Sequence, residues 1–323
     1  SSSKRKPLQL VVILLQIAAI NSYDLHPGDS SYWCTNCLGP QLADTLLTYQ
    51  RPSGGWPKNE NPQPGDVYTG TEIEGCLDNG ATVDEIRFMA QAYKEMGDEL
   101  YKNSAVKGLD FIFDSQHTEN SAGGGWPQFF PLIGGYKDAI TFNDNLHINV
   151  MKLLDELNAH TAPFDIEPFS TETRTQNALE RGMECILATQ IQITGLAGCP
   201  TRTNWCAQHN RFTLDPIAAR DYEPVSYSGN EGMKIALYLM DIASPSVEIK
   251  EAIVGAYVWA KKSVLLDYAK DRDTNDDKIL VYSEGAMLWP RFATIPHSSP
   301  IFCDRGCVND DSLMYNDFPV GYS

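Results

Sequence analysis

Arg220 stands in the segment AARDYEPVSYSG, residues 218–229, where aromatic, proline, serine and glycine residues surround an arginine in an acidic chain. The residues after it show neither the period of an amphipathic helix nor the alternation of a strand. Because Pro224 breaks any helix that reaches it, the segment is expected to be a loop. The structural explanation for Arg220 is an ion pair with a neighbour such as Asp221 or Glu223.

Oxygen-bearing side chains stand just before two predicted helices. Residues 143–145 are Asn-Asp-Asn, and residues 78–79 are Asp-Asn. The structural interpretation of either cluster is a helix N-cap, for which Asn and Asp are preferred. The chemical interpretation is a set of hard oxygen ligands. If the two helix entrances face each other, Asp78 and Asp144 make an incomplete site of the kind that calcium accepts, with positions left for water or substrate.

Two short segments share the sequence Gly-Gly-Trp-Pro, SGGWPKN at 53–59 and AGGGWPQFF at 122–130. Each presents an indole, that of Trp56 or Trp126, where the backbone turns tightly, which suits contact with the flat face of a sugar. The alternative is that both tryptophans are buried and fix their loops to a helical core. Two copies of four residues are weak evidence of an internal repeat.

Amphipathic helices are the elements that must position these residues. Apolar residues recur at helical spacing in four segments, and Thr82 and Glu85 are spaced as a capping box in the first. The predicted helices cover residues 81–97, 145–160, 177–191 and 247–266. The stretches between them are rich in Gly, Pro, Asn and Asp and carry no strong strand signal. The expected fold is mainly α, with little β structure and with long irregular loops that carry the chemistry.

Charge and the first residues of the chain bear on its partners and its location. The 323 residues include 25 Lys and Arg against 42 Asp and Glu, a net charge of −17, so nucleic acid is not expected as a partner. Residues 1–22 place three basic residues before a short apolar run, the form of a secretory signal, with a signal anchor or a truncated linker as alternatives. We expect a secreted, extracellular protein that lacks a membrane anchor once the leader is removed.

The chain has eight cysteines, and the expected export affects how they are interpreted. In an oxidising compartment an even number is most simply a set of disulfides, whose connectivity the sequence leaves open. Cys34 and Cys37, like Cys303 and Cys307, are spaced as half of a zinc site. Neither pair has a suitable partner pair nearby, so a structural zinc is disfavoured.

Seven motifs in order resemble the pectate lyases of polysaccharide lyase family 10. They extend from about residue 40 to residue 310 and are SGGWPK, DNGATVDEIRFMA, GGGWPQFFP, ITFNDN, WCAQHNRFTLDP, AARDYEPVSYSG and PIFCDRG. The resemblance implies a partial α/α toroid, and we expect a single catalytic domain over residues 34–323 and a monomer. It also implies calcium dependence and cleavage of polygalacturonate by β-elimination.

Individual residues take roles from this resemblance. Arg220 of AARDYE matches the family's catalytic base, while Asp144 of TFNDN and Asp78 of DNGAT match its calcium-binding carboxylates. The residues expected to hold substrate are Arg291, Arg305, Arg181, Asn145 and Trp126, with Arg181 favoured over Arg202 as a further cation. The chain departs from the family in reading WPRFAT for WARFYE and CDRGC for SDRDG, at Arg291 and Arg305.

The implied chemistry explains how an acidic protein would bind a polyanion. Calcium would bridge acidic protein to acidic substrate, and arginine forks would clamp uronate carboxylates. Elimination removes the weakly acidic C5 proton and expels the C4 oxygen, and cations stabilise the enolate-like transition state. Because the free pKa of arginine exceeds about 12, we expect nearby cations to disfavour its protonated form and activity to rise towards alkaline pH.

Two other functions fit the same residues. A glycoside hydrolase on a similar toroid would use two carboxylates, and its candidates are Glu74, Asp144, Glu223 and Glu231. It would release reducing ends without a new double bond and without calcium. A secreted pectin-binding protein that has lost turnover would bind polygalacturonate and give no product.

Overall fold

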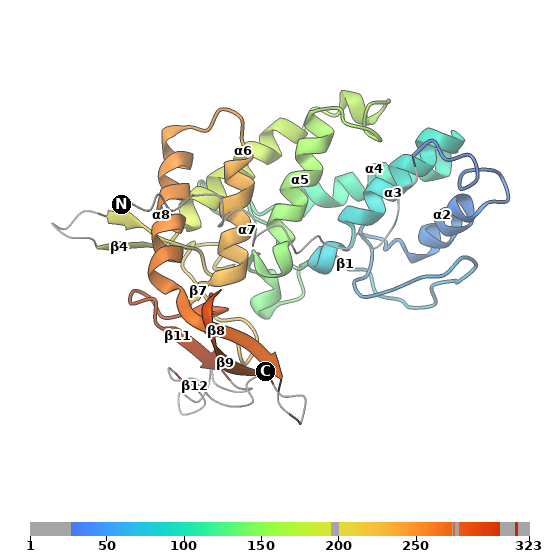
Figure 1. Ribbon diagram of the computed structural model, residues 1–323. Helices are drawn as coiled ribbons and strands as arrows, with labels where there is room; N and C mark the ends of the chain where they lie inside the picture. Colours follow the sequence, from blue (N-terminus) through green and yellow to red (C-terminus); the bar gives the residue numbers. More distant parts are fainter. Residues whose placement is uncertain (1–26, 195–199, 273, 275–277, 304–313, 316–323) are drawn as a thin grey trace, which may run out of the picture.

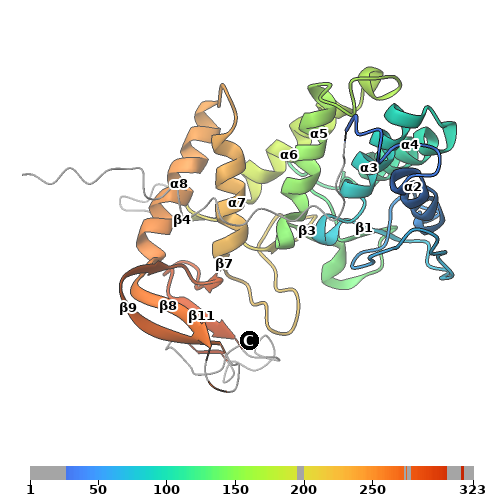
Figure 2. The same cartoon turned by 45° about the vertical axis from the view of Figure 1, so that its right-hand side comes forward.

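The computed structural model describes residues 27–194, 200–272, 274, 278–303 and 314–315. Figure 1 shows their helices as an open arc in chain order, from α2 at one end to α8 at the other, and Figure 2 shows the same arc turned. The helices are α2 Leu38–Tyr49, α3 Val83–Met96, α4 Glu99–Asp114, α5 Leu146–Asn158, α6 Thr175–Thr189, α7 Gly229–Met240 and α8 Val247–Ser263. The fold is a partial α/α toroid, as the sequence predicts, and the described helices do not close a barrel.

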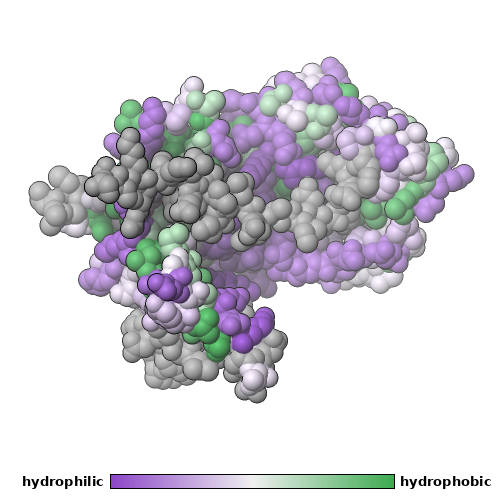
Figure 3. All heavy atoms as spheres, in the orientation of Figure 1, coloured by the Kyte–Doolittle hydropathy of each residue, from purple (hydrophilic) through white to green (hydrophobic). Residues whose placement is uncertain are grey.

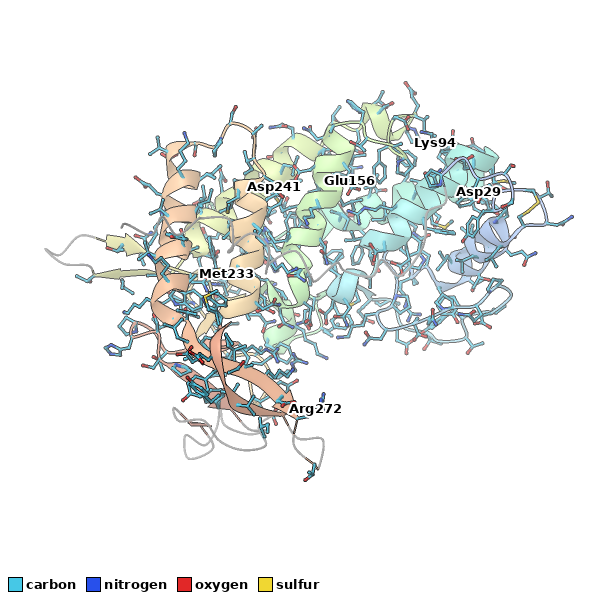
Figure 4. The ribbon with its side chains drawn as sticks, in the orientation of Figure 1. Asp29, Lys94, Glu156, Met233, Asp241 and Arg272 are labelled. Atoms are coloured by element: carbon cyan, nitrogen blue, oxygen red, sulfur yellow. A yellow bond between two sulfur atoms is a disulfide. The ribbon has the colours of Figure 1, made fainter. Side chains whose placement is uncertain are left out.

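Consecutive helices pack as pairs, α3 with α4, α5 with α6 and α7 with α8. Further contacts join α3 to α5 and α5 to α7, and others join α2 to α4 and α6 to α8. The arc therefore has an inner row of α3, α5 and α7 and an outer row of α2, α4, α6 and α8. Because the inner helices run in the same direction, their N-terminal ends meet along one edge. Asp241 after α7 and Glu156 near the end of α5 mark the opposite edge (Figure 4).

A tryptophan closes each outer helix near its C-terminal end; Trp56, Trp126 and Trp205 are buried, and Trp289 is partly buried. The indole N–H of Trp56, Trp126 and Trp205 donates to the carbonyl oxygens of Leu46, Ile112 and Ile186, at 2.9, 2.9 and 2.7 Å, and Trp289 donates to Ala260 at 2.8 Å. These carbonyls lie in the last turns of α2, α4, α6 and α8, where backbone donors run out. The indoles add to the bonds from Gln50 N to Leu46 O, from Ser115 Oγ to Ile112 O and from Thr189 Oγ1 to Ile186 O. The Gly-Gly-Trp-Pro echo is thus part of a structural repeat, and Trp56 and Trp126 are core residues with no exposed surface.

Three glutamine side chains, of which Gln116 and Gln190 are buried and Gln50 is partly buried, join one outer helix to the next. The side-chain amide of Gln50, just after α2, donates to Ser104 in α4 at 2.9 Å. That of Gln116, after α4, donates to Ala178 in α6 at 2.9 Å, and that of Gln190, after α6, donates to Ala252 in α8 at 2.8 Å. Each amide also donates to a carbonyl of the loop that precedes the tryptophan, at 2.6 to 2.8 Å. The spacing between adjacent outer helices is therefore held by the same hydrogen-bonded unit three times.

Short strands connect the loops between helices. They are β1 Gly75–Cys76 with β2 Phe129–Phe130, β3 Ile140–Thr141 with β6 Gln208–His209, β4 Gln192–Thr194 with β5 Pro200–Arg202, and the sheet β12-β11-β10-β7 of Met314–Tyr315, Pro300–Cys303, Phe292–Ala293 and Tyr227–Ser228. One long hairpin, β8 Leu265–Arg272 with β9 Lys278–Leu288, lies below α7 and α8 in both ribbon views. This hairpin and helices α2, α4 and α7 are not among the elements that the sequence predicts.

Some local predictions are wrong. Thr82 is no capping-box residue, because its φ of 66° turns the chain and its hydroxyl accepts from Trp56 N at 2.8 Å and donates to Cys76 O at 2.7 Å. The cysteines are not all paired either. Cys34 and Cys37 form a disulfide, but the buried thiols of Cys76, Cys185 and Cys206 are free. The side chains of Cys199, Cys303 and Cys307 lie outside the described part of the chain, as do residues 1–22.

The described surface is largely hydrophilic, with scattered exposed apolar residues. Figure 3 shows hydrophilic residues over most of one face, with hydrophobic ones in scattered patches. Exposed apolar side chains occur on the outer face of α8, at Val247, Val254 and Val258, and on the hairpin at Leu266. Among the described residues, no helix has both the length and the apolar character needed to cross a bilayer.

Gln116→Leu is expected to lower the free energy of unfolding by roughly 2–4 kcal/mol, because two buried carbonyl oxygens, those of Gly124 and Ala178, lose their donor. Urea unfolding monitored by circular dichroism measures the loss. Gln176→Leu is the control, since the exposed side chain of Gln176 bonds, among the described residues, only to Glu180, and it should change stability by less than about 0.5 kcal/mol. Equal effects of the two substitutions would contradict the role of the buried glutamines.

Candidate active site

Two similar turns begin the inner helices α3 and α5. The 3₁₀ turn η2, Asp78–Gly80, precedes α3, and η4, Asn143–Asn145, precedes α5. Asn79, Asp144 and Asn145 adopt left-handed backbone conformations with φ of 56°, 51° and 62°, which Asn and Asp tolerate better than most residues. The two turns pack against each other. The N-terminal ends of α3 and α5 therefore meet, which is the condition for a calcium site at Asp78 and Asp144.

Several oxygen atoms at this junction are buried without a hydrogen-bond partner among the described residues. They are Oδ1 of Asp78, Oδ1 of Asn143 and Oδ1 of Asn145. The other oxygen of Asp78 accepts from Lys58 Nζ at 2.7 Å, and Oδ2 of Asp144 accepts from Asn143 Nδ2 at 2.8 Å. Leaving buried oxygens unpaired costs free energy. A cation that takes carboxylate and amide oxygens as ligands would remove this cost, so the donor set fits calcium.

Asp144 is the electrostatic centre of the site. Its burial raises the pKa of its carboxyl group, and the negative charges of Asp78 and of Glu231, in the first turn of α7, raise it further. Arg220 and Arg291 act in the opposite direction. Asp144 therefore lies close enough to two other carboxylates and to two guanidinium groups to interact with them electrostatically, at the N-terminal edge of the inner helices.

The described residues hold no cluster of three or more His, Cys, Asp or Glu side chains with the geometry of a metal centre. The oxygen set at η2 and η4 is instead two carboxylates with amide oxygens, and this mixture resembles calcium ligation more than zinc ligation.

Glu223 joins the two arginines of the site. Its Oε1 accepts from Arg220 Nη2 at 2.5 Å and from Arg291 Nη2 at 2.9 Å, and its Oε2 accepts from Arg220 Nε at 2.8 Å. The Glu223 side chain is only 5% exposed, whereas those of Arg220 and Arg291 are 38% and 46% exposed. The ion pair that the sequence suggests for Arg220 therefore exists, and it also fixes Arg291.

This ion pair changes the acidity of Arg220. Its hydrogen bonds to Glu223 raise the pKa of the guanidinium above the usual value for arginine, and Asp144 adds to the shift while burial opposes it. This shift is the reverse of the expected one, a pKa lowered by surrounding cations. The difference arises because the nearest charge is the buried carboxylate of Glu223, so the side chain is protonated as it stands.

The position of Arg291 depends on a close backbone contact. Gly229 N, at the start of α7, donates to Arg291 O at 2.9 Å, and β10 pairs with β7 directly after it. A Cβ at Gly229 would lie 2.1 Å from Pro290 O, so glycine is needed there. Pro290, a departure from the family motif, does not keep Arg291 from reaching Glu223.

Three candidate substrate-binding residues are placed elsewhere. Arg181 donates through Nη2 to the carbonyl oxygens of His117 and Gly123, at 2.7 and 2.6 Å, so it fixes a loop. Arg202 donates to Leu187 O at 2.8 Å and is equally committed to structure. Trp126 is fully buried and cannot stack on a sugar, which corrects its assignment. Arg305 lies outside the described residues.

His147, in the first turn of α5, packs beneath the residues that lead into the η4 turn. It is completely buried, with its ring against Trp126 and Phe142 and its Nε2 3.2 Å from Gly182 O. Burial lowers its pKa to about 3, so the imidazole is neutral at working pH. It packs the base of the site and has no access to solvent.

Sequence reasoning missed parts of the site. Lys58 follows Trp-Pro in the first Gly-Gly-Trp-Pro segment, where a lone cation in an acidic region is the signal that could have revealed it. Glu231, which the sequence suggests only as a hydrolase carboxylate, accepts from the hydroxyl of Ser228, and only the fold brings it to Asp144. Glu223 was considered for an ion pair, but its link to Arg291 crosses 68 residues.

Comparison with known structures defines the class of this protein. A family 10 polysaccharide lyase from Cellvibrio cellulosa is similar over 88% of this chain and 84% of its own, with a TM-score of 0.74 and 33% sequence identity. A single-site mutant of a family 10 lyase from the same organism, solved in complex with trigalacturonic acid, has the same TM-score of 0.74 and identity of 33%, and is covered over 85% of its length. The fold is that of a polysaccharide lyase.

The family model described as pectic acid lyase matches residues 50–323. The chain therefore belongs to the pectic acid lyase family, and it is a pectate lyase. No sequence among the curated proteins matches it.

Arg181→Met is expected to lower the thermal midpoint, because two loop carbonyls lose a charged donor, while leaving the KM for polygalacturonate unchanged. Arg291→Met is the contrasting variant. Since Arg291 is nearly half exposed, it should alter stability less and raise KM by about 10-fold or more, as loss of a hydrogen bond to a charged group does. A raised KM in Arg181→Met with normal stability would restore Arg181 to the site.

Proposed function

We propose that the chain cleaves polygalacturonate by calcium-dependent β-elimination, with Arg220 as the group that removes the C5 proton. The observation that carries the proposal is the meeting of the Asp78 and Asp144 turns with the pair Arg220 and Arg291 at one edge of the inner helices. Family membership and the trigalacturonic acid complex of a similar lyase support it.

Asp78, Asp144 and the amide oxygens of Asn143 and Asn145 are the residues that would hold calcium. When bound there, the ion would draw charge from a uronate carboxylate and so make the C5 proton more acidic. Without it, four side chains with a net negative charge would face a polyanion. The unpaired Oδ1 atoms supply the specific support, since they are buried ligands that no side chain of the described chain satisfies.

Arg220 and Arg291 would bind and orient the sugar acid. The hydrogen bond from Arg291 to Glu223 uses one of the five N–H donors of the guanidinium, which leaves others for a carboxylate. Arg220 must give up its proton before it can act as a base, and Glu223 holds that proton in place. The base function therefore requires alkaline pH, or cations close enough to outweigh Glu223.

A hydrolase mechanism is less suited to these residues. Glu223 accepts hydrogen bonds from two arginines, and Glu231 accepts from Ser228 and Asn230. Neither carboxyl is placed to give a proton to a glycosidic oxygen, which a hydrolase requires. Secretion is part of the proposal on the strength of the composition of residues 1–22 and of the polymeric substrate, which is too large to enter a cell intact.

The activity is tested by following the ultraviolet absorbance of the unsaturated uronate product with polygalacturonate at alkaline pH. We expect a rise that needs calcium, disappears with chelator, and falls by at least about 10³-fold in Arg220→Ala, as for loss of a catalytic base together with its charge. Reducing-sugar release without absorbance would indicate a hydrolase. Binding of the polymer without any product would indicate an inactive binder, and either result would contradict the proposal.

Glu223→Gln should shift the rising limb of the plot of kcat against pH, where activity increases as Arg220 loses its proton, to lower pH. Glu223 raises the pKa of Arg220, so its neutralisation lowers that pKa and increases the unprotonated fraction at a given pH. Asp221→Asn removes the same charge from an exposed neighbour of Arg220 and should leave the profile in place. A limb that does not move in Glu223→Gln would show that Arg220 is not the titrating base.

A further inference from the structure

A second group of cations lies on the α3 side of the calcium candidate, opposite the arginines on the α7 side. It consists of Lys58 and Lys137, whose ammonium groups both contact the ring of Phe129, together with that ring. We propose that these three residues form a further uronate-binding subsite, which receives a carboxylate of the polymer at some distance from the bond that is cleaved. The inference rests on the proposed function and names a part of the substrate-binding surface that Arg220 and Arg291 do not cover.

Both ammonium groups lie close to one aromatic ring. Lys58 Nζ is 5.9 Å and Lys137 Nζ is 5.4 Å from the centroid of Phe129, within the range of a cation–π contact. Two like charges that share a ring repel each other. An anion bound between them would turn this repulsion into attraction, so the arrangement favours a carboxylate ligand.

Intramolecular carboxylates leave much of this charge available. Lys58 donates one hydrogen bond to Asp78, which leaves two of its three N–H donors for a ligand. No ion pair joins Lys137 to any carboxylate of the described residues. Its neighbour Asp138 is used by the backbone, since Asp138 Oδ1 accepts from the N–H groups of Ile133 and Gly134 at 3.0 and 2.8 Å.

The backbone holds the three residues in register with the calcium candidate. Phe129 in β2 pairs with Cys76 in β1, two residues before Asp78. Gln128 N donates to Lys137 O at 2.9 Å, and Leu77 N donates to Gln128 O at 2.9 Å, which ties the loop to the η2 turn. The subsite is thus preorganised by the same segments that build the site, so little conformational entropy would be lost on binding.

The substrate has the periodic charge that such an arrangement would recognise. Each galacturonate carries one carboxylate, so a chain held at calcium presents further carboxylates to both sides. The arginines lie beside α7, and Lys58 with Lys137 lies beside α3, so cations flank the acidic junction at both ends. In a chain of net charge −17, a cationic cluster at this edge would also concentrate a polyanion locally.

Lys137→Met tests the subsite without disturbing Asp78, because Lys137 has no ion pair with it. We expect both the KM for polygalacturonate and the Kd measured by calorimetry in calcium to rise about 5-fold. This factor corresponds to about 1 kcal/mol of binding free energy, the upper value for an exposed charge pair. The kcat and the calcium concentration for half-maximal activity should not change, and Lys137→Arg should retain wild-type KM. Lys250→Met, an equal change of charge on exposed α8, is the control.

The outcomes separate the subsite from the lyase activity. A KM and Kd for Lys137→Met equal to those of Lys250→Met would overturn the subsite while wild-type turnover stood. If wild-type protein gave no unsaturated product, the proposed function would fail, and the Kd comparison would still decide the subsite. Failure of the wild-type protein to bind polygalacturonate would overturn both.

Discussion

The contact between the η2 and η4 turns is the constraint on which the rest of the site depends. It buries carboxylate and amide oxygens at the N-terminal ends of α3 and α5, and some of those oxygens have no hydrogen-bond partner in the part of the chain that the structure describes. Left-handed residues at Asp144 and Asn145 are needed to make the turn. Such a junction is stable only because rigid helices, closed by buried tryptophans and joined by buried glutamines, hold the two turns in place. The folded scaffold thus supports an arrangement that the turns alone would avoid.

Opposite charges are organised around this junction in a definite order. The carboxylates lie at its centre, and cations flank them, Lys58 on the side of α3 and Arg220 with Arg291 on the side of α7. Glu223 keeps the two arginines together, at the cost of making Arg220 harder to deprotonate. The acidic character of the whole chain and its affinity for an acidic polymer are compatible because attraction is confined to this edge.

Amphipathic periodicity predicted α3, α5, α6 and α8 and a mainly α fold, whereas the motif resemblance implied the toroid and identified the family. Helix α4 could also have been predicted, since Asp98 caps it and buried apolar residues such as Ala105 and Leu109 recur along it, whereas α7 begins with Gly-Asn-Glu-Gly and gives little helical signal. The structural role of Arg181 could not be predicted, because the carbonyl oxygens of His117 and Gly123 that it binds are brought together only by tertiary packing. The burial of Trp126 is likewise a property of the helix pair, and the Gly-Gly-Trp-Pro sequence suits either environment.

Calorimetric titration of calcium in the presence of trigalacturonate tests the central claim, that Asp78 and Asp144 hold a divalent cation together with a uronate. An Arg220→Lys background at neutral pH keeps the positive charge and slows turnover, and a titration without protein corrects for binding by the sugar. We predict that the trisaccharide strengthens calcium binding and that adding Asp144→Asn lowers calcium affinity by at least about 10-fold, the effect of losing one charged ligand. Calcium binding of equal strength with and without the Asp144 carboxylate would contradict the account.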